Sequence, residues 1–225
     1  MKRISRPSFV LGFAAAIGGL LAVGTVALAR AHPTSRPATR SVQATGAPSS
    51  APLAVLSRPR EAKDDLPAGL VASVADLAGG PELAPEVRNG AVQTRASHLA
   101  LSNLGAAKAS FYVVPTAKGR VCIVITNGPQ GCDDGHFTVA RPATWGLTDA
   151  DGYRKGRPTS VDGLVPNNVD RVTVVDDKGG RTDARLGNNA YYVELADGAA
   201  MPTSVFVHFA DGGSATIDLP SITVG

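Results

Sequence analysis

Two apolar runs separated by a turn constrain the fold of this chain more than any other stretch. The runs are residues 111–114 and 121–125, and the turn between them contains Pro115, Lys118 and Gly119. Because both runs are apolar at odd and even positions, neither has a face suited to water. This pattern is typical of interior strands in a sheet that is covered on both sides. We therefore expect these strands at the centre of the folded part.

The start of the chain carries a membrane-targeting pattern. Lys2, Arg3 and Arg6 precede a run without charged residues over residues 7–29. A run of about 20 residues is long enough to span a membrane as a helix. Positive charges before such a run predict that the N-terminus stays in the cytoplasm, so residues 1–7 are expected there.

Residues 8–29 can be interpreted in two ways, as a retained anchor or as a cleaved signal peptide. The length of the run favours a retained single-pass transmembrane anchor in the lipid bilayer. The alternative is a cleaved signal peptide and a secreted product, because Ala27-Leu28-Ala29 and Ala29-Arg30-Ala31 both fit a small-x-small cleavage site. Either fate places the remainder of the chain outside the cytoplasm.

Residues 30–60 are predicted to form a disordered linker. They are rich in Ala, Pro, Ser, Thr and Arg and show no apolar period. Such a segment cannot bury enough apolar surface to offset the entropy lost on ordering. We expect a loose tether, followed by an extracytoplasmic β-rich domain over residues 61–225.

Charge is unevenly distributed along the chain. All 19 acidic residues and 14 of the 22 Lys and Arg residues lie from Glu61 onward, which gives that part a charge of −5. A mildly acidic domain offers no electrostatic reason to bind nucleic acid.

Cys122 and Cys132 are the two cysteines of the chain. In an oxidising compartment, two cysteines of one domain are expected to form a disulfide. The closed loop would contribute roughly 2.5–3 kcal/mol in the chain-entropy model. Two free thiols, or a metal site that includes Asp133, Asp134 and His136, are the alternatives. The disulfide is favoured over a metal site because the spacing matches no zinc pattern.

One amphipathic helix is predicted before the central strands. Apolar residues recur at helical spacing from Leu70 to Leu77, and Gly79-Gly80-Pro81 ends the run. Asp64 and Asp65 predict an acidic cap at the start of this helix. We expect the helix to cover one face of the central strands.

Short strand patterns fill most of the rest of the chain. They cover residues 98–102, 137–140, 161–165, 169–175, 182–186, 190–195, 204–209 and 215–219. For the last pair, a three-residue loop over residues 211–213 would place Val207 opposite Ile217, with the apolar side chains on one face. The expected class is α+β, mostly β: after the transmembrane helix and the linker, a mainly antiparallel β-sheet or half-sandwich with one or two covering helices.

Residues 163–174 combine a Gly-Leu-Val-Pro turn, Asn167-Asn168 and a valine-rich strand. With the strand that holds Cys122 and the segment Asn188-Asn189-Ala190-Tyr191, this pattern resembles a group of uncharacterised exported or membrane-anchored proteins of high-GC Gram-positive bacteria. The resemblance covers roughly residues 55–195, and Asn167-Asn168 departs from the more usual Asp-Gly. It implies location and architecture but no activity. Physically the segment predicts a turn, in which the asparagines tolerate left-handed geometry.

No local catalytic signature is present in the sequence. It has no G-x-S-x-G, H-E-x-x-H, P-loop or dinucleotide-binding motif. We therefore expect a non-catalytic binding or structural module of the cell envelope, not an enzyme, with no cofactor and no metal. The alternative is a small exported hydrolase whose residues meet only in the folded chain, with His98 or His136 beside a carboxylate and a hydroxyl.

One predicted loop after the second cysteine mixes aromatic and basic side chains. Long loops on a rigid sheet often carry binding function. This mixture would suit an anionic envelope polymer, a phospholipid head group or an acidic partner protein. Besides the bilayer, the expected partner is therefore an envelope polymer or another envelope protein. The candidate binding residues are Arg141, Trp145, Tyr153, Arg154, Lys155 and Arg157.

Overall fold

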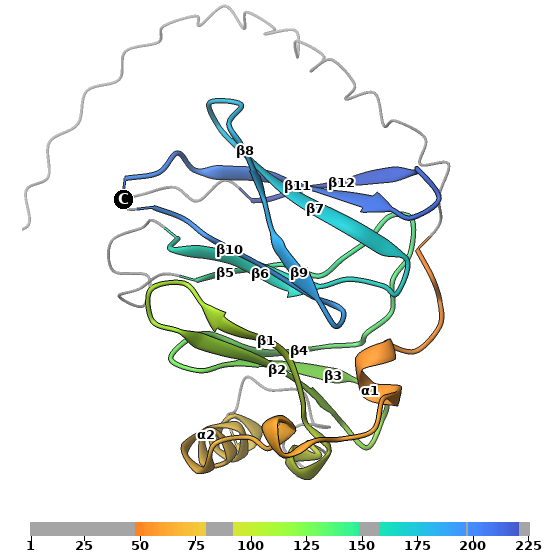
Figure 1. Cartoon of the computed structure of the whole chain (residues 1–225), viewed down its shortest axis with the longest axis vertical. Helices are drawn as coiled ribbons and strands as arrows, with labels where there is room; N and C mark the ends of the chain where they lie inside the picture. Colours follow the sequence, from red (N-terminus) through yellow and green to blue (C-terminus); the bar gives the residue numbers. More distant parts are fainter. Residues whose placement is uncertain (1–47, 80–91, 149–157, 197, 221–225) are drawn as a thin grey trace, which may run out of the picture. The chain divides into compact units, whose positions relative to one another are not determined.

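Three antiparallel sheets account for most of the described chain (Figure 1). The computed structural model describes residues 48–79, 92–148, 158–196 and 198–220. The first sheet consists of β1 His98–Leu104, β2 Ala109–Pro115, β3 Val121–Ile125 and β4 Gln130–Asp133, in that order. The middle sheet has the order β5 Gly146–Thr148, β6 Ser160–Leu164, β10 Ala190–Glu194 and β9 Arg185–Gly187. The third sheet has the order β12 Ser214–Asp218, β11 Pro202–Phe209, β7 Val169–Asp176 and β8 Arg181–Asp183.

The middle sheet is buried on both faces. Leu164 belongs to a core cluster that includes Phe111 of the first sheet. Val161, on the opposite face of β6, packs in a second cluster with Val172 and Val205 of the third sheet. The sheets are therefore stacked with the middle one between the other two (Figure 1). The mostly antiparallel β class is confirmed, and the half-sandwich is replaced by three layers.

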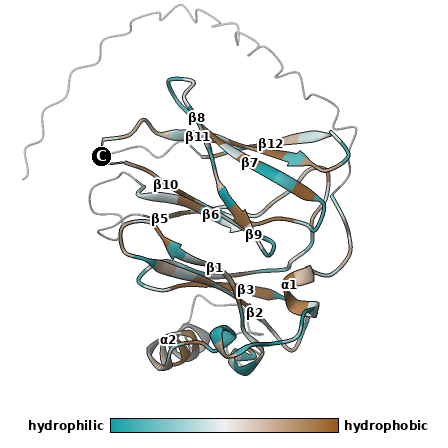
Figure 2. Ribbon diagram, in the orientation of Figure 1, coloured by the Kyte–Doolittle hydropathy of each residue, from teal (hydrophilic) through white to brown (hydrophobic). Residues whose placement is uncertain are grey.

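The first sheet is also covered on both faces, as its apolar runs predicted. Helix α2, Ala68–Gly79, packs Val74 against Val114 and Val124 on the outer face. Phe111 and Val113 face the middle sheet. Figure 2 shows the contrast with β7, which has a hydrophilic stretch where the exposed Asp170 and Arg171 follow Val169. The predicted acidic cap is wrong, because Asp64 lies in a separate 3-10 turn, Ala62–Asp64, with its side chain buried.

Two predicted strands differ from the structure. Residues 182–186 are divided between β8 and β9, which belong to different sheets, because an alternating pattern does not identify the strand's neighbour. Residues 137–140 form no named strand. They contribute one isolated bridge, from Thr138 to Arg141, and Phe137 is buried in the core between the first and middle sheets.

The last hairpin has a different register from the predicted one. Val207 lies opposite Ala215, and Val205 lies opposite Ile217. The Phe209 amide donates to the Gly213 carbonyl, so the loop again has three residues but is 210–212. The pairing shifts by two positions, and therefore the apolar side chains still share one face.

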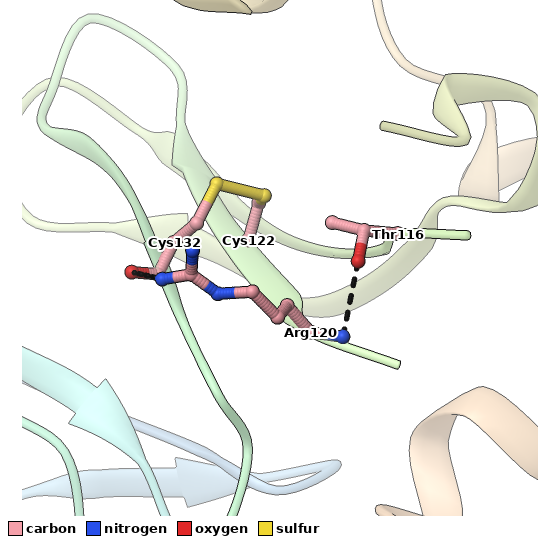
Figure 3. The surroundings of a disulfide bond; sticks show 4 residues. All are labelled: Thr116, Arg120, Cys122 and Cys132. Atoms are coloured by element: carbon pink, nitrogen blue, oxygen red, sulfur yellow. Dashed lines mark hydrogen bonds between the residues drawn. A yellow bond between two sulfur atoms is a disulfide. The ribbon is translucent and has the colours of Figure 1, made fainter. Parts of the chain in front are cut away.

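The disulfide is confirmed. Cys122 and Cys132 are direct cross-strand partners in β3 and β4, with Sγ atoms 2.07 Å apart (Figure 3). Cys122 is 2% exposed and packs in the cluster under α2. The disulfide thus joins the strands beneath the helix.

Arg120 links the turn before β3 to β4. Its backbone amide donates to Thr116 Oγ1 at 3.0 Å, and its guanidinium donates to the Cys132 carbonyl at 3.4 Å.

The folded part begins before the expected boundary at residue 61. Residues 54–57 form a helical turn, α1 Ala54–Ser57, and Leu53 and Val55 are buried in the core between the first and middle sheets. Within the expected linker, residues 48–60 therefore belong to the folded body rather than to a loose tether.

Three asparagine side chains hold this early segment against the body. Asn168, Asn167 and Asn189 accept hydrogen bonds, in that order, from the backbone amides of Ser49, Ala54 and Val55 at 2.8–3.0 Å. The predicted left-handed geometry is found not at residues 167 and 168 but at Asn188 and Asn189, with φ of 47° and 64°. The side-chain oxygens of Asn167 and Asn168 thus accept hydrogen bonds from backbone amides of this segment that would otherwise lack a partner.

The predicted cytoplasmic N-terminus, residues 1–7, and the apolar run, residues 8–29, lie outside the described residues. Within the described ranges, no helix combines the length and apolar character needed to cross a bilayer.

Candidate functional site

A half-open cleft lies between the first and middle sheets. It consists of two hollows of about 760 and 480 Å³ that share Pro129, Gln130 and Leu147 in their linings. We call them together the inter-sheet cleft, and we call the smaller one the Trp145 cavity. The first sheet contributes Gln130 and Cys132 to the Trp145 cavity, and the middle sheet contributes Asp162. Cavities of this size accommodate small ligands.

Asp162 is the most unusual group in the cleft. Strand β6 places it opposite Tyr192 on one side and Gly146 on the other. Its side chain is 2% exposed, and Thr148 Oγ1 donates to Oδ1 at the long distance of 3.3 Å. Burial raises the pKa of Asp162 to about 6, although the Thr148 hydroxyl works in the opposite direction. A buried carboxyl with so little compensation is typical of binding and catalytic sites.

Gly146 leaves room for this carboxyl group. A methyl group built on Gly146 would lie 3.1 Å from Asp162 Oδ2. Trp145, the residue before it, lines the same cavity and is 41% exposed. The residue just before β5 is therefore a large accessible aromatic side chain, directly beside the glycine that makes space for the buried carboxyl.

Gln130 lines the cleft, but its side chain lies on the other face of the first sheet. Gln130 pairs with Val124, which packs under α2, and its Nε2 donates to Ser73 Oγ of that helix at 2.8 Å. Its Oε1 is buried and has no hydrogen-bond partner among the described residues. This acceptor therefore lies on the α2 side of the sheet and is not counted among the polar groups of the cleft.

Charged side chains in the described lining of the cleft are all acidic. Asp133 and Asp162 line the Trp145 cavity, and Glu194 lines the larger hollow. Burial raises the pKa of Asp133, with the nearby Asp134 adding to the effect and Arg141 opposing it. Glu194 accepts a hydrogen bond from the Ala106 amide at 2.8 Å. The described lining is thus suited to neutral or positively charged ligands rather than to anions.

Of the candidate binding residues that the structure describes, Trp145 lines the cleft and Arg141 does not. Trp145 lies in the cleft, whereas the Arg141 guanidinium is engaged by Asp133 at 3.3 Å, by Asp134 and by the His136 carbonyl. Arg141 therefore already has acidic partners within its own loop. The remaining candidates, Tyr153, Arg154, Lys155 and Arg157, lie outside the described residues.

Sequence reasoning missed Asp162 and Thr148. Asp162 did leave a signal, because it interrupts the apolar strand 161–165 with an acidic residue at an interior position. An acidic residue in a strand buried on both faces must be either paired or functional. Nothing local marks Thr148, which reaches Asp162 only through the pairing of β5 with β6.

Ser97, His98 and Asp64 lie close together but do not form a catalytic triad. Ser97 Oγ donates to the Asp64 carbonyl oxygen at 2.6 Å, and His98 Nδ1 is 3.9 Å from Asp64 Oδ2. The Asp64 carboxylate is occupied by Arg58 and by the Leu99 amide. Burial and neighbouring arginines lower the pKa of His98. Because these side chains are buried and line neither hollow of the cleft, they make a structural network.

Comparison with protein-family models, curated proteins and solved structures finds no match to this chain. The resemblance to exported proteins of high-GC Gram-positive bacteria therefore stays a prediction.

Proposed function

We propose that this chain is a single-pass, membrane-anchored extracytoplasmic protein that binds an envelope component in its inter-sheet cleft without transforming it. The observation that carries the proposal is the Trp145 cavity, where an exposed aromatic side chain adjoins the desolvated Asp162. Aromatic rings with a few fixed polar groups are the usual composition of sites for small polar ligands.

Two observations support the location. The uncharged run over residues 8–29 follows three basic residues, which is typical of an anchor. The disulfide between Cys122 and Cys132 is of the kind that persists in oxidising compartments outside the cytoplasm. The cleft's acidic lining favours a neutral or cationic envelope polymer, or a partner protein that presents such groups, over the anionic partners expected from the loop composition.

Fluorescence of the detergent-solubilised full chain tests the proposal, because Trp145 is the sole tryptophan. Soluble fragments of cell-envelope polymers are titrated in, and saturable binding is expected to change the Trp145 emission. Trp145→Ala should weaken binding about tenfold when it is followed by calorimetry, since an aromatic side chain that a ligand covers on binding contributes about 1–2 kcal/mol or more. Val139→Ala is the matched control, because Val139 is an exposed apolar residue outside both hollows. Equal loss in both variants, or no saturable binding to any envelope fraction, would contradict the proposal.

A second candidate function has one observation in its favour. A carboxyl group with a pKa of about 6 beside a hydroxyl, as at Asp162 and Thr148, is suited to general acid catalysis. Glu194 lies on the same face of the middle sheet, because it pairs with Ser160, two residues from Asp162. Product release from the same envelope fragments, lost in Asp162→Asn, would favour an exported hydrolase. Binding without turnover favours the module.

A further inference from the structure

We infer that the Trp145 cavity recognises an organic ammonium group, held by Asp162 and Asp133 and covered by Trp145. The inference rests on the proposed binding function and names the chemical class of its ligand. The combination of groups in one cavity carries it, since none of them would suffice alone.

Charge selects a cation. Asp162 and Asp133 both line the cavity, and no Lys or Arg side chain appears in its described lining. Asp133 has one basic neighbour, Arg141, at 3.3 Å. Asp162 has no basic partner among the described residues and receives one long hydrogen bond from Thr148. A ligand cation would supply the counter-charge that this desolvated carboxylate lacks.

The other lining groups select an organic cation over a metal ion. Trp145 and Ile123 provide apolar walls. Hard metal ions prefer six or more oxygen ligands, whereas an ammonium group on a carbon framework gains from aromatic and apolar contact. A volume of about 480 Å³ accommodates such a group together with part of the molecule that carries it.

Affinity should depend on pH, because Asp162 must be ionised to pair with a cation. Tyr192 and Glu194 of β10 and uncharged Gly146 and Thr148 of β5 share the Asp162 face of the sheet, and Asp133 lies across the cavity. Tyr191 lies on the opposite face of β10. Burial raises the pKa of both tyrosines, so they stay neutral throughout. With a pKa of about 6 for Asp162, about a tenth of the Asp162 carboxyl groups are ionised at pH 5. Affinity should fall about tenfold between pH 7.5 and pH 5, and Asp133 acts in the same direction.

Calorimetry on the full chain, in a detergent without an ammonium head group, tests the inference with choline as the probe. Its neutral isostere 3,3-dimethylbutan-1-ol has the same shape without the charge, and sodium chloride at matched ionic strength tests simple cation attraction. We expect choline to bind at least about tenfold more tightly than the isostere. Equal binding of choline and the isostere, or displacement of choline by sodium ions at millimolar concentration, would overturn the inference.

Asp162→Asn is the decisive variant, because it keeps the shape and removes the charge. It should reduce choline affinity about tenfold and reduce the pH dependence to the part that Asp133 contributes, while leaving the isostere unaffected. The protein should remain folded, since an amide is less costly to bury than a carboxylate. Asp218→Asn, on an exposed position of the third sheet, should leave affinity unchanged. Loss of choline binding in neither or in both variants contradicts the inference.

The outcome separates this inference from the proposed function. If neutral envelope fragments bind and depend on Trp145 but choline does not bind, the binding module stands and the ammonium specificity fails. If neither envelope fragments nor choline bind, both fail.

Discussion

Asp64→Asn is expected to lower the free energy of unfolding by about 3 kcal/mol, because it leaves Arg58 without its counter-charge. The Asp64 side chain has no exposed surface and accepts a hydrogen bond from each of two Arg58 guanidinium nitrogens, at 2.5 and 2.8 Å. It also accepts hydrogen bonds from the backbone amides of Glu61 and Leu99. An asparagine cannot accept at both positions, so at least one buried donor would lose its partner. Urea unfolding monitored by circular dichroism measures the change.

Asp64→Asn should also change how the free energy of unfolding depends on pH. Burial alone would raise the pKa of Asp64, but Arg58 and the two amides outweigh it and hold the pKa well below the usual value. A depressed folded-state pKa stabilises the protein above the unfolded pKa of about 3.9, and this stabilisation is lost as pH falls below about 4. Asp64→Asn should therefore flatten stability between pH 4 and pH 2.

Asp65→Asn is the matched control for Asp64. Asp65 is adjacent in the chain and pairs with Arg60, but its side chain is 72% exposed. An exposed ion pair contributes between about 0 and 1 kcal/mol, so this variant should unfold almost as the unchanged protein does. Equal losses from the two variants would mean that Asp64 does not anchor a buried network.

Gly163→Ala is expected to lower the free energy of unfolding by about 3 kcal/mol, because overpacked sites force the backbone to move. A methyl group on Gly163 would overlap the Thr144 carbonyl oxygen and lie 2.7 Å from Tyr191 Cε1. That carbonyl accepts the Tyr191 hydroxyl at 2.9 Å, and the Thr144 amide donates to Leu164. The loop that carries Trp145 is thus pressed against β6 where only glycine fits.

Gly131→Ala provides the comparison, because the space around Gly131 is open within 4 Å and Gly131 also lies in a strand. It should change stability by less than about 0.5 kcal/mol. Thermal unfolding of both variants, with Trp145 fluorescence as a second readout, distinguishes a local shift of the loop from global loss of stability. A neutral Gly163→Ala would contradict the close approach of residue 144 to β6.

The interior strands could be predicted from the sequence because a strand that is buried on both faces is apolar at both odd and even positions. Residues 111–114 and 121–125 predicted cover on both faces with a helix on one of them; the helix is found, and the middle sheet covers the other face. The partners of the later strands could not be predicted in the same way. Residues 182–186 alternate as one strand, but Ala184 lies between two strands of different sheets. Pairing depends on long-range packing, which local alternation does not encode.

Only part of the candidate site was predictable. Trp145 was recognised as an accessible aromatic residue in a loop, and it lies in the cleft. The basic residue Arg141 was assigned to binding from composition, but its acidic partners, Asp133 and Asp134, come from the preceding turn. Asp162 became visible only when the middle sheet was seen to be covered on both faces.

An NMR titration of the Asp162 carboxyl carbon, assigned by its absence in Asp162→Asn, tests most directly whether the cleft holds a desolvated acid ready for a ligand. A midpoint near pH 6 is predicted, because burial between the sheets raises the pKa to about 6. A midpoint near the ordinary value of about 3.9 would show that water or a basic group already compensates Asp162, and it would contradict the binding site described for this chain.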